Sequence, residues 1–227
     1  NSIFADSMEV MADEINNGKS FETVVKEFIT KHRRIIFNGD GYSAKWEEMA
    51  KELGLLNNKN TVDALNCLDD QKNIDMFKRL GVYSEVELKA RHEILLESYI
   101  KTIQLEGLTA LKMAKTQLYP AICDYLAKLS SEIISIKNAN LDAEFLLKDA
   151  EKLTKQIKSM KEEMDKLEQN IKFAQNLDDT IEKQSIVWRD YVFVSMQSLR
   201  EITDMIEESI DAKYWPIPTY VDLLFGI

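Results

Sequence analysis

The segment FNGDGYSAKW, residues 37–46, contains the spacing Gly39-x-Gly41-x-x-Ala44, which is typical of loops that bind dinucleotide phosphates. Such a loop follows a β-strand, opens a helix and precedes a second strand with an acidic residue about 20 positions further on. Asp63 lies near that distance, but the sequence LLNNKNTV before it has no strand character. The pattern therefore does not predict a nucleotide site.

The same glycines are better explained by a tight turn. We expect Gly39 and Gly41 to take positive φ angles, which glycine adopts without steric penalty, and Ser43 to cap the helix that follows. Four side chains in and beside this turn are the most suitable in the chain to contact an anion or an effector. They are Arg33, Arg34, Asn38 and Tyr42.

No other motif predicts catalysis or metal binding. Di-iron helical bundles use Glu-x-x-His pairs, whereas His32 and His92, the only histidines, have Ile and Lys three positions before them. The two cysteines, Cys67 and Cys123, form no C-x-x-C motif, so neither a zinc site nor a disulfide framework is indicated. We expect no catalytic residue, cofactor site or metal site in this chain.

Composition narrows the class of partner. The 227 residues include 29 Lys and Arg against 39 Asp and Glu, a formal net charge of −10 at pH 7, which is unsuited to binding a nucleic-acid backbone. The sequence has no membrane-spanning run of about eighteen apolar residues and no signal peptide. We expect a soluble, cytoplasmic protein without nucleic-acid or membrane partners. Because it begins at Asn1 rather than Met, we expect a piece of a longer protein.

The fold class that the elements predict is all-α. Glycine and proline number only 7 and 3, and long stretches have the apolar spacing of amphipathic helices. Residues 1–83 are expected to form a small N-terminal subregion with a helical hairpin, the glycine turn and short helices. Residues 84–214 are expected to form a long-helix bundle with an antiparallel, coiled-coil-like arm. Residues 215–227 form an apolar tail that we expect to pack on this bundle, with packing on another domain or subunit as the alternative.

Two long helices are expected to flank the arm. The first begins at the capping box Ser84-x-x-Glu87, and Pro120, which lacks an amide proton, is expected to kink or break it. Its buried face is predicted to carry Leu88, Leu95, Tyr99, Ile103 and Leu108. The last helix, about residues 185–213, is predicted to bury Ile186, Val194, Leu199, Ile202, Ile206 and Ile210.

Between these helices lies a repeat of apolar residues spaced alternately by four and three positions, the pattern of a coiled-coil seam about four heptads long. The seam consists of Leu146, Ala150, Leu153, Ile157, Met160, Met164, Leu167, Ile171 and Ala174. Pairs of Glu and Lys four residues apart predict a solvated outer face. A seam needs a partner helix, and the nearest candidates are the helical stretch 121–137 and the last helix. We therefore expect an antiparallel bundle within one chain, with pairing between two chains as the alternative.

Several longer segments resemble one family. The run HRRIIFNGDGYSAKW at residues 32–46, LGLLN at 53–57, TVDAL at 61–65 and WPIPTY at 215–220 are similar to the C-terminal helical region of type III glutamine synthetases. The first run, NSIFADSMEVMADEI, is similar to the junction that follows the catalytic portion in that family. Matches therefore extend along nearly the whole chain, although residues 138–213 resemble the family only in being helical.

The resemblance implies that the parent enzyme joins ammonia to glutamate, using ATP and a divalent metal (Mg²⁺ or Mn²⁺), in a large homo-oligomer. The residues that bind metal and nucleotide in that family belong to its catalytic portion, and no motif here matches them. A non-catalytic structural or interaction domain, inactive alone, is therefore expected, with the catalytic portion of the same chain and other copies of the enzyme as partners. The alternative is that this region contributes an effector pocket or a few active-site side chains.

Overall fold

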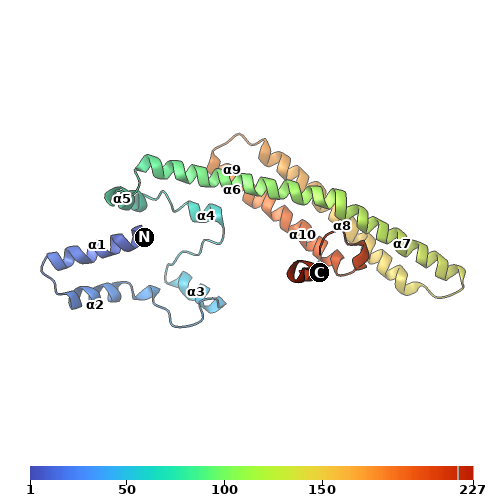
Figure 1. The fold of residues 1–227 in the computed structure, drawn as a ribbon, viewed down its shortest axis with the longest axis horizontal. Helices are drawn as coiled ribbons and strands as arrows, with labels where there is room; N and C mark the ends of the chain where they lie inside the picture. The colour runs from blue at the N-terminus through green and yellow to red at the C-terminus, as the bar shows by residue number, and fades with distance from the viewer. Residues whose placement is uncertain (219, 227) are drawn as a thin grey trace. The chain divides into compact units, whose positions relative to one another are not determined.

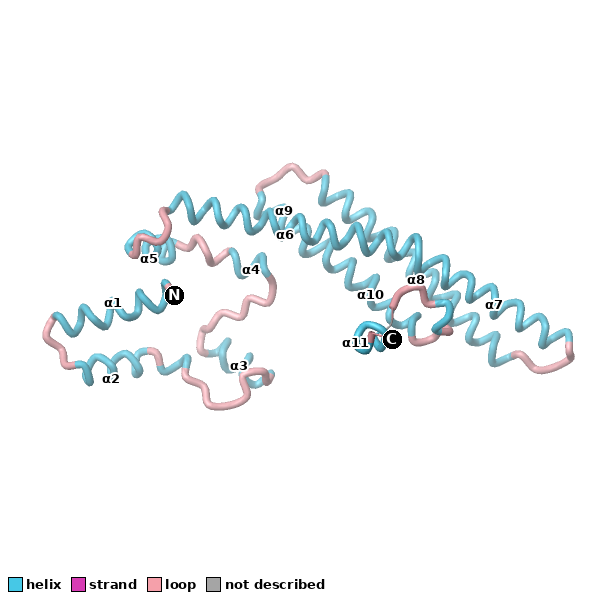
Figure 2. Tube along the Cα trace, viewed as in Figure 1, coloured by secondary structure: helices cyan, strands magenta, loops and turns pink. Residues whose placement is uncertain are grey.

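A computed structural model describes residues 1–218 and 220–226 of the chain. These residues contain helices and loops and no strand, so the predicted all-α fold is confirmed (Figures 1 and 2). Contacts within the chain divide it into two compact units, Asn1–Leu96 and Glu97–Ile227. This division lies inside the helix α6 (Glu85–Met113), whereas the domain boundary after residue 83 stays a prediction.

The first unit is built from short helices that precede α6. They are α1 (Ser2–Asn16), α2 (Phe21–Lys31), the 3₁₀ turn η1 (Arg33–Ile35), α3 (Ala44–Glu52), α4 (Thr61–Leu65) and α5 (Gln71–Arg79). Helices α1 and α2 contact each other, as a helical hairpin requires. The side chains of Ser20 and Asn60 accept hydrogen bonds from the first-turn amides of α2 and α4, which explains where these helices begin.

The second unit contains the long helices. Its elements after α6 are the π-helical segment η2 (Ala114–Leu118), α7 (Tyr119–Asn138), α8 (Glu144–Gln175), α9 (Ile181–Val187), the π-helical segment η3 (Trp188–Phe193), α10 (Val194–Glu207), the 3₁₀ turn η4 (Ala212–Tyr214) and α11 (Tyr220–Phe225). Residues 139–143 reverse the chain between α7 and α8, and α8 packs against both α7 and α10 (Figure 1).

The predicted capping box opens α6. The backbone amide and the hydroxyl of Ser84 both donate to Glu87 Oε2 at 2.8 Å, and the Glu87 amide donates to Ser84 Oγ at 3.3 Å. Both hydrogen bonds from Ser84 lower the pKa of the Glu87 carboxyl, and the bond from the backbone amide has the larger effect. The start of α6 is therefore fixed by local chemistry that the sequence displays.

Of the two outcomes expected at Pro120, a kink or a break, the break is wrong, and the kink stays a prediction. The chain stays helical from Glu85 to Asn138, with the wider turn of η2 directly before α7. Proline has no amide proton for the carbonyl four residues earlier, and its ring crowds that carbonyl. A π-helical turn relieves this crowding without ending the helix.

The buried stripe of α6 differs from the predicted one. Leu88 and Ile103 are buried as expected, but Leu95 and Leu108 are 45% and 44% exposed. Their places are taken by Leu96, Ile100, Ala114 and Leu111, because a spacing dominated by four residues moves the stripe around the helix. Gly107 lies on the new stripe.

At Gly107 the helix backbone lies very close to its neighbours. A Cβ atom there would lie 3.2 Å from Val192 Cγ1 and 3.4 Å from Ile171 Cδ1. The residue therefore permits α6 to approach α8 and η3 more closely than any larger side chain would.

The last helix is also buried on a different face than predicted. Leu199, Ile202, Ile206 and Ile210 are buried, but Ile186 and Val194 are 37% and 51% exposed. The buried positions of this segment continue at spacings of three and four residues through η3: Ser185, Trp188, Val192, Ser195, Leu199, Ile202 and Ile206. Ile186 and Val194 each lie one residue away from a serine on this stripe, so the buried face includes residues that an apolar pattern does not reveal.

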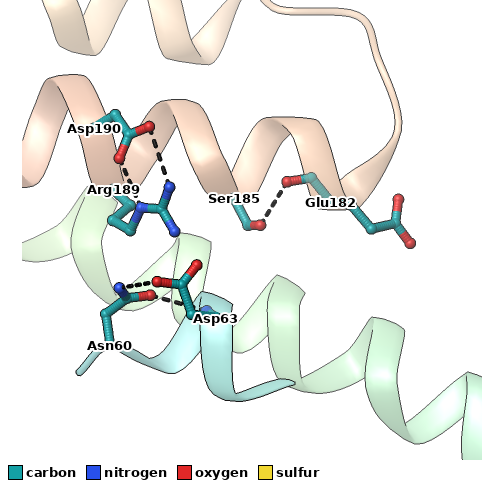
Figure 3. A network of polar contacts seen from close by, with 6 residues as sticks. All are labelled: Asn60, Asp63, Glu182, Ser185, Arg189 and Asp190. Atoms are coloured by element: carbon teal, nitrogen blue, oxygen red, sulfur yellow. Dashed lines mark hydrogen bonds and ion pairs between the residues drawn. The ribbon is translucent and has the colours of Figure 1, made fainter. Parts of the chain in front are cut away.

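Polar side chains satisfy the backbone around η3. Asn170 of α8 donates to the carbonyl of Tyr191 at 3.3 Å and to Ser195 Oγ at 2.6 Å. One turn earlier, Ser185 Oγ donates to the carbonyl of Glu182 at 2.7 Å (Figure 3). The widened turn is thus held by hydrogen bonds that an uninterrupted α-helix would not need.

The predicted seam on α8 is largely buried. Of its nine positions, Ala150, Leu153, Met160, Met164, Leu167, Ile171 and Ala174 are buried, and Leu146 and Ile157 are half-buried. The core that they join contains residues of α6, α7 and α10, so these side chains pack within one chain. The coiled-coil geometry of this arm stays a prediction.

The tail packs on the bundle only at its beginning. Trp215 is buried and Ile217 lies against the core, but the apolar side chains of α11 are 57–75% exposed. They are Val221, Leu223, Leu224 and Phe225. Pro216 and Pro218 interrupt the chain before α11, which therefore forms a separate short helix. Thr219 and Ile227 of the predicted tail lie outside the described residues.

Among the described residues, no helix is both long enough and apolar enough to cross a bilayer.

A substitution of Leu167 tests whether the seam pairs within the chain. Leu167 is fully buried, and a carboxylate at this position would have to be desolvated without a partner. We expect Leu167→Asp to lose helicity at every protein concentration, measured by far-UV circular dichroism and light scattering. The control Gln169→Asp, on the exposed side of α8, is expected to keep its helicity. A folded Leu167→Asp chain with a lower oligomer mass than the wild type would instead place the seam between chains.

Candidate functional site

The glycine turn, residues 37–46, has a different backbone from the one predicted. Gly39 and Gly41 do not take positive φ angles, and that prediction is wrong. The turn is made by side chains instead: Asp40 Oδ1 accepts from the Tyr42 amide at 3.0 Å, and Ser43 Oγ donates to the Asp40 carbonyl at 2.7 Å. Such an Asx turn supplies the chain reversal that we had assigned to glycine flexibility.

Gly39 is required by packing rather than by its φ angle. The rings of Phe37 and Trp46 stack with a centroid distance of 4.2 Å and an interplanar angle of 23°. A Cβ atom on Gly39 would lie 2.6 Å from Cζ of Phe37, whereas one on Gly41 would have no heavy atom within 4 Å. Ser43 completes the turn by accepting from the Trp46 amide at 3.3 Å, so the predicted helix cap is confirmed.

The four candidate contact residues do not form an enclosed site. Arg33, Arg34, Asn38 and Tyr42 are all exposed, and Tyr42 is fully so. Arg34 donates from Nη1 to the carbonyl of Leu53 at 3.3 Å, where α3 ends. A cation at a helix C-terminus is favourable, so Arg34 has a structural role. The turn thus presents Tyr42 to solvent from a well-fixed backbone.

The helical hairpin leaves apolar side chains in water. Helix α1 has no buried residue, and Ile3 and Phe4 are 74% and 70% exposed. On α2, Phe21 and Ile29 are 66% and 52% exposed, although Val24 is buried. We call these four exposed side chains the hairpin face: Ile3, Phe4, Phe21 and Ile29.

Ion pairs hold the hairpin in place. Lys19, between its helices, pairs with Glu14 at 2.6 Å and with Glu27 at 2.9 Å, and these hydrogen bonds raise the pKa of the Lys19 amine. Arg79 of α5 pairs with Asp6 and Glu9 of α1. A fixed hairpin with an apolar surface is more typical of an interaction site than of a catalytic one.

His92 is a buried polar residue for which we predicted no place. It is 5% exposed, its Nδ1 lies 3.5 Å from Asp69 Oδ2, and its Nε2 has no hydrogen-bond partner in the described part of the chain. Its position four residues after Leu88 and four before Leu96 is the sequence signal that would have placed it on the buried stripe.

Two separate sets of polar contacts, one at the start of α4 and one in η3, were also not predicted from the sequence. Asn60 accepts from the Asp63 amide at 2.9 Å and donates to its carboxylate at 2.6 Å, which caps α4. Arg189 of η3 donates to both carboxylate oxygens of its neighbour Asp190, at 2.6 and 3.2 Å (Figure 3).

A metal site of the kind that the resemblance implies for the parent enzyme does not fit the described residues. Within residues 1–218 and 220–226, no group of three or more His, Cys, Asp or Glu side chains is arranged to hold a metal ion. In the glycine turn, the backbone amides of Tyr42 and Trp46 donate to side chains of the turn itself. We therefore derive no chemical step in this chain through ATP or metal.

The fold thus defines the chain as an all-α domain. Its helices expose apolar side chains, and its glycine turn contains an aromatic stack and a helix cap. The family described as "Glutamine synthetase C-terminal domain" matches residues 20–137 of the chain. This chain belongs to that family, and the predicted resemblance is confirmed.

Full-length relatives support the same assignment. The chain is 33% identical over 207 residues to a glutamine synthetase of Butyrivibrio fibrisolvens, covering 90% of this chain and 29% of that protein. It is 28% identical over 243 residues to the type-3 glutamine synthetase of Dictyostelium discoideum, covering 99% of this chain and 32% of that protein. A glutamine synthetase of Bacteroides fragilis is 26% identical over 99% of this chain. The chain thus spans about a third of the length of these relatives.

The aromatic stack gives a test of the turn. Gly39→Ala places a methyl group against the Phe37 ring, so we expect the ring to shift and the stack with Trp46 to loosen, at a cost of about 1 kcal/mol in stability. The measurement is the indole N–H signal of Trp46 in a two-dimensional NMR spectrum, assigned with Trp46→Phe. Gly41→Ala is the matched control and is expected to leave that signal in place. Equal shifts in the two variants would show that packing against Phe37 does not require Gly39.

Proposed function

We propose that this chain is the non-catalytic C-terminal structural and interaction domain of a type III glutamine synthetase. In this proposal the parent enzyme joins ammonia to glutamate in the cytoplasm with ATP and Mg²⁺ or Mn²⁺, and the chain shapes contacts between domains and between subunits. The proposal rests on the hairpin face. Its four large apolar side chains are exposed on a hairpin that ion pairs hold in place, and such a surface favours a protein partner.

Two further features support a partner within the same enzyme. The relatives are about three times as long as the segment that matches this chain, which leaves room in them for a catalytic portion. The side chains of α11, including Leu224 at 75% and Phe225 at 69% exposure, add a second apolar surface. Apolar surface of this kind is stabilised when a neighbouring domain or subunit removes it from water.

A second candidate function is a direct contribution to an effector pocket or to the active site of the parent enzyme. Tyr42 favours it, since its side chain is fully exposed at the tip of a turn that Asp40 and Ser43 hold in place. Arg33 and Asn38, both exposed and close in sequence, are the other side chains that would take part. Titration of the isolated chain with ATP, glutamate and glutamine separates a self-contained pocket, which gives heat or shifts, from a domain that binds none of them.

Catalytic activity is the first test of the main proposal. We expect the isolated chain, supplied with glutamate, ammonia, ATP and Mg²⁺, to form no glutamine in a coupled assay of ADP release. Glutamine formation by the purified chain would contradict the proposal.

The hairpin face gives the second test. Phe4→Asp is expected to leave the fold of the chain intact, because Phe4 is exposed, and to weaken its binding to the separately purified catalytic portion of the parent enzyme at least about tenfold. Leu105→Asp, which introduces the same charge at a residue of α6 that is 68% exposed, is the control and is expected to bind like the wild type. Binding is measured by calorimetry or light scattering. Unchanged binding of Phe4→Asp would remove the hairpin face from the interface.

A further inference from the structure

Two asparagines of the chain are followed directly by glycine, in the pairs Asn17-Gly18 and Asn38-Gly39. An asparagine in this position is chemically labile in water, because the backbone nitrogen of the next residue can attack the side-chain amide. Glycine has no Cβ atom that would hinder this attack. Both pairs are exposed, so water and base reach each of them. Exposure alone therefore does not distinguish the two sites.

The first pair is held at the end of α1. Asn17 is the C-cap residue of this helix, and its backbone amide donates to the carbonyl of Asp13 at 2.9 Å. The Gly18 amide donates to the carbonyl of Ile15, also at 2.9 Å, and Gly18 has a φ angle of 99°. To attack the side chain before it, the Gly18 nitrogen would have to lose the proton that makes this hydrogen bond and leave the helix cap.

The second pair has fewer restraints. It lies in the loop between η1 and α3 (Figure 2). The Ile36 amide, which precedes the pair, donates to the carbonyl of Arg33 at 3.1 Å, and the hydrogen bonds that hold the glycine turn begin at Asp40. Within the described residues, neither the backbone amide of Gly39 nor the side chain of Asn38 forms a hydrogen bond with another protein group. The Gly39 nitrogen can therefore approach the neighbouring side chain without breaking a contact.

We propose that Asn38 is a site of spontaneous deamidation, a covalent modification of the glycine turn. The Gly39 nitrogen loses its proton to hydroxide and forms a bond to Cγ of Asn38. The bond between Cγ and Nδ2 then breaks, and Nδ2 leaves as ammonia after it takes a proton from water, which restores the hydroxide. The product of this step is a cyclic imide, a succinimide. The inference does not rest on the proposed function.

Water completes the reaction by opening the imide. When water adds at Cγ of residue 38, the bond from Cγ to the Gly39 nitrogen breaks and the product is aspartate. When it adds at the backbone carbonyl carbon, the backbone bond to that nitrogen breaks, and the chain continues through the side chain as isoaspartate. The net reaction consumes one water and releases one ammonia, so it needs no oxidant, reductant or further reactant.

Either product changes the glycine turn. A carboxylate at position 38 places a negative charge two residues before Asp40 at neutral pH. Isoaspartate also adds a methylene group to the backbone between Phe37 and Gly39, where space is short, since a Cβ atom on Gly39 would lie 2.6 Å from Cζ of Phe37. The Phe37 ring stacks on Trp46, so the stack is expected to shift as the modification proceeds.

A comparison of the two Asn-Gly pairs tests the proposal on the full 227-residue chain. The chain is incubated in mildly alkaline buffer and digested at intervals, and mass spectrometry measures the deamidated fraction of the peptides that contain Asn17 and Asn38. We expect Asn38 to react at least about threefold faster than Asn17, because the hydrogen bond of Gly18 must be broken before attack. In concentrated urea, which unfolds the helix cap, we expect the two rates to become nearly equal. A rate ratio in buffer no larger than the ratio in urea would overturn the proposal.

Two matched variants locate the reaction. Asn38→Gln lengthens the side chain by one methylene group, so the ring that would form is larger and forms more slowly. We expect this variant to lose both the deamidation at position 38 and the gradual shift of the Trp46 indole N–H signal in a two-dimensional NMR spectrum. Asn17→Gln makes the same change at the end of α1 and is expected to keep both at the wild-type rate. A Trp46 signal that shifts in Asn38→Gln as fast as in the wild type would overturn the assignment to Asn38.

Discussion

The second unit depends on the burial of one apolar stripe along α8. Met160, Leu167 and Ile171 are removed from water by helices on both sides, and each fully buried side chain of this size contributes roughly 1.5–3 kcal/mol. A helix with a single apolar stripe of this kind is not stable alone, because without neighbouring helices its apolar side chains stay in water. The positions of α7 and α10, which both pack against α8, follow from this need.

The proposed interaction surfaces differ from this core because their apolar side chains stay exposed to solvent. In the first unit, polar contacts do much of the positioning: Lys19 links the hairpin helices, Arg79 links α1 to α5, and Arg34 closes the end of α3. Exposed ion pairs contribute little stability individually, but they orient short helices that bury little apolar surface. A domain of this kind is suited to gaining further stability from a partner, which agrees with the role proposed for the hairpin face.

The sequence predicts local features well where the chemistry is local. The caps at Ser20, Ser43 and Ser84 are all visible as a hydroxyl before a helical period, and the structure confirms each. The seam on α8 is predictable for the same reason, since an uninterrupted helix keeps its apolar period. Arg33, Asn38 and Tyr42 lie in or beside the glycine turn by their sequence positions, but the sequence does not show that they stay exposed, and their role as ligand contacts stays a prediction.

The predictions that failed depend on tertiary geometry. An apolar pattern assigns Leu95, Leu108 and Val194 to buried faces, whereas the buried stripes include His92, Gly107 and Ser195, whose residue types do not indicate burial. The role of Gly39 depends on where the ring of Phe37 lies, and the role of Gly107 depends on where the side chains of Val192 and Ile171 lie. Neither distance is encoded in the spacing of residue types along the chain.

The extra residue in η3 also determines which change of length this helix tolerates. A π-helical turn absorbs one residue, so deleting one residue between 188 and 193 would leave a regular α-helix whose later side chains still face α8. Leu199, Ile202 and Ile206 would then stay in the core. Deleting one residue just after Val194, inside the regular helix α10, would instead turn the residues before the deletion and those after it by about 100° relative to each other. Insertions and deletions are also expected at residues 139–143 and 176–180, where the chain leaves one helix before it enters the next.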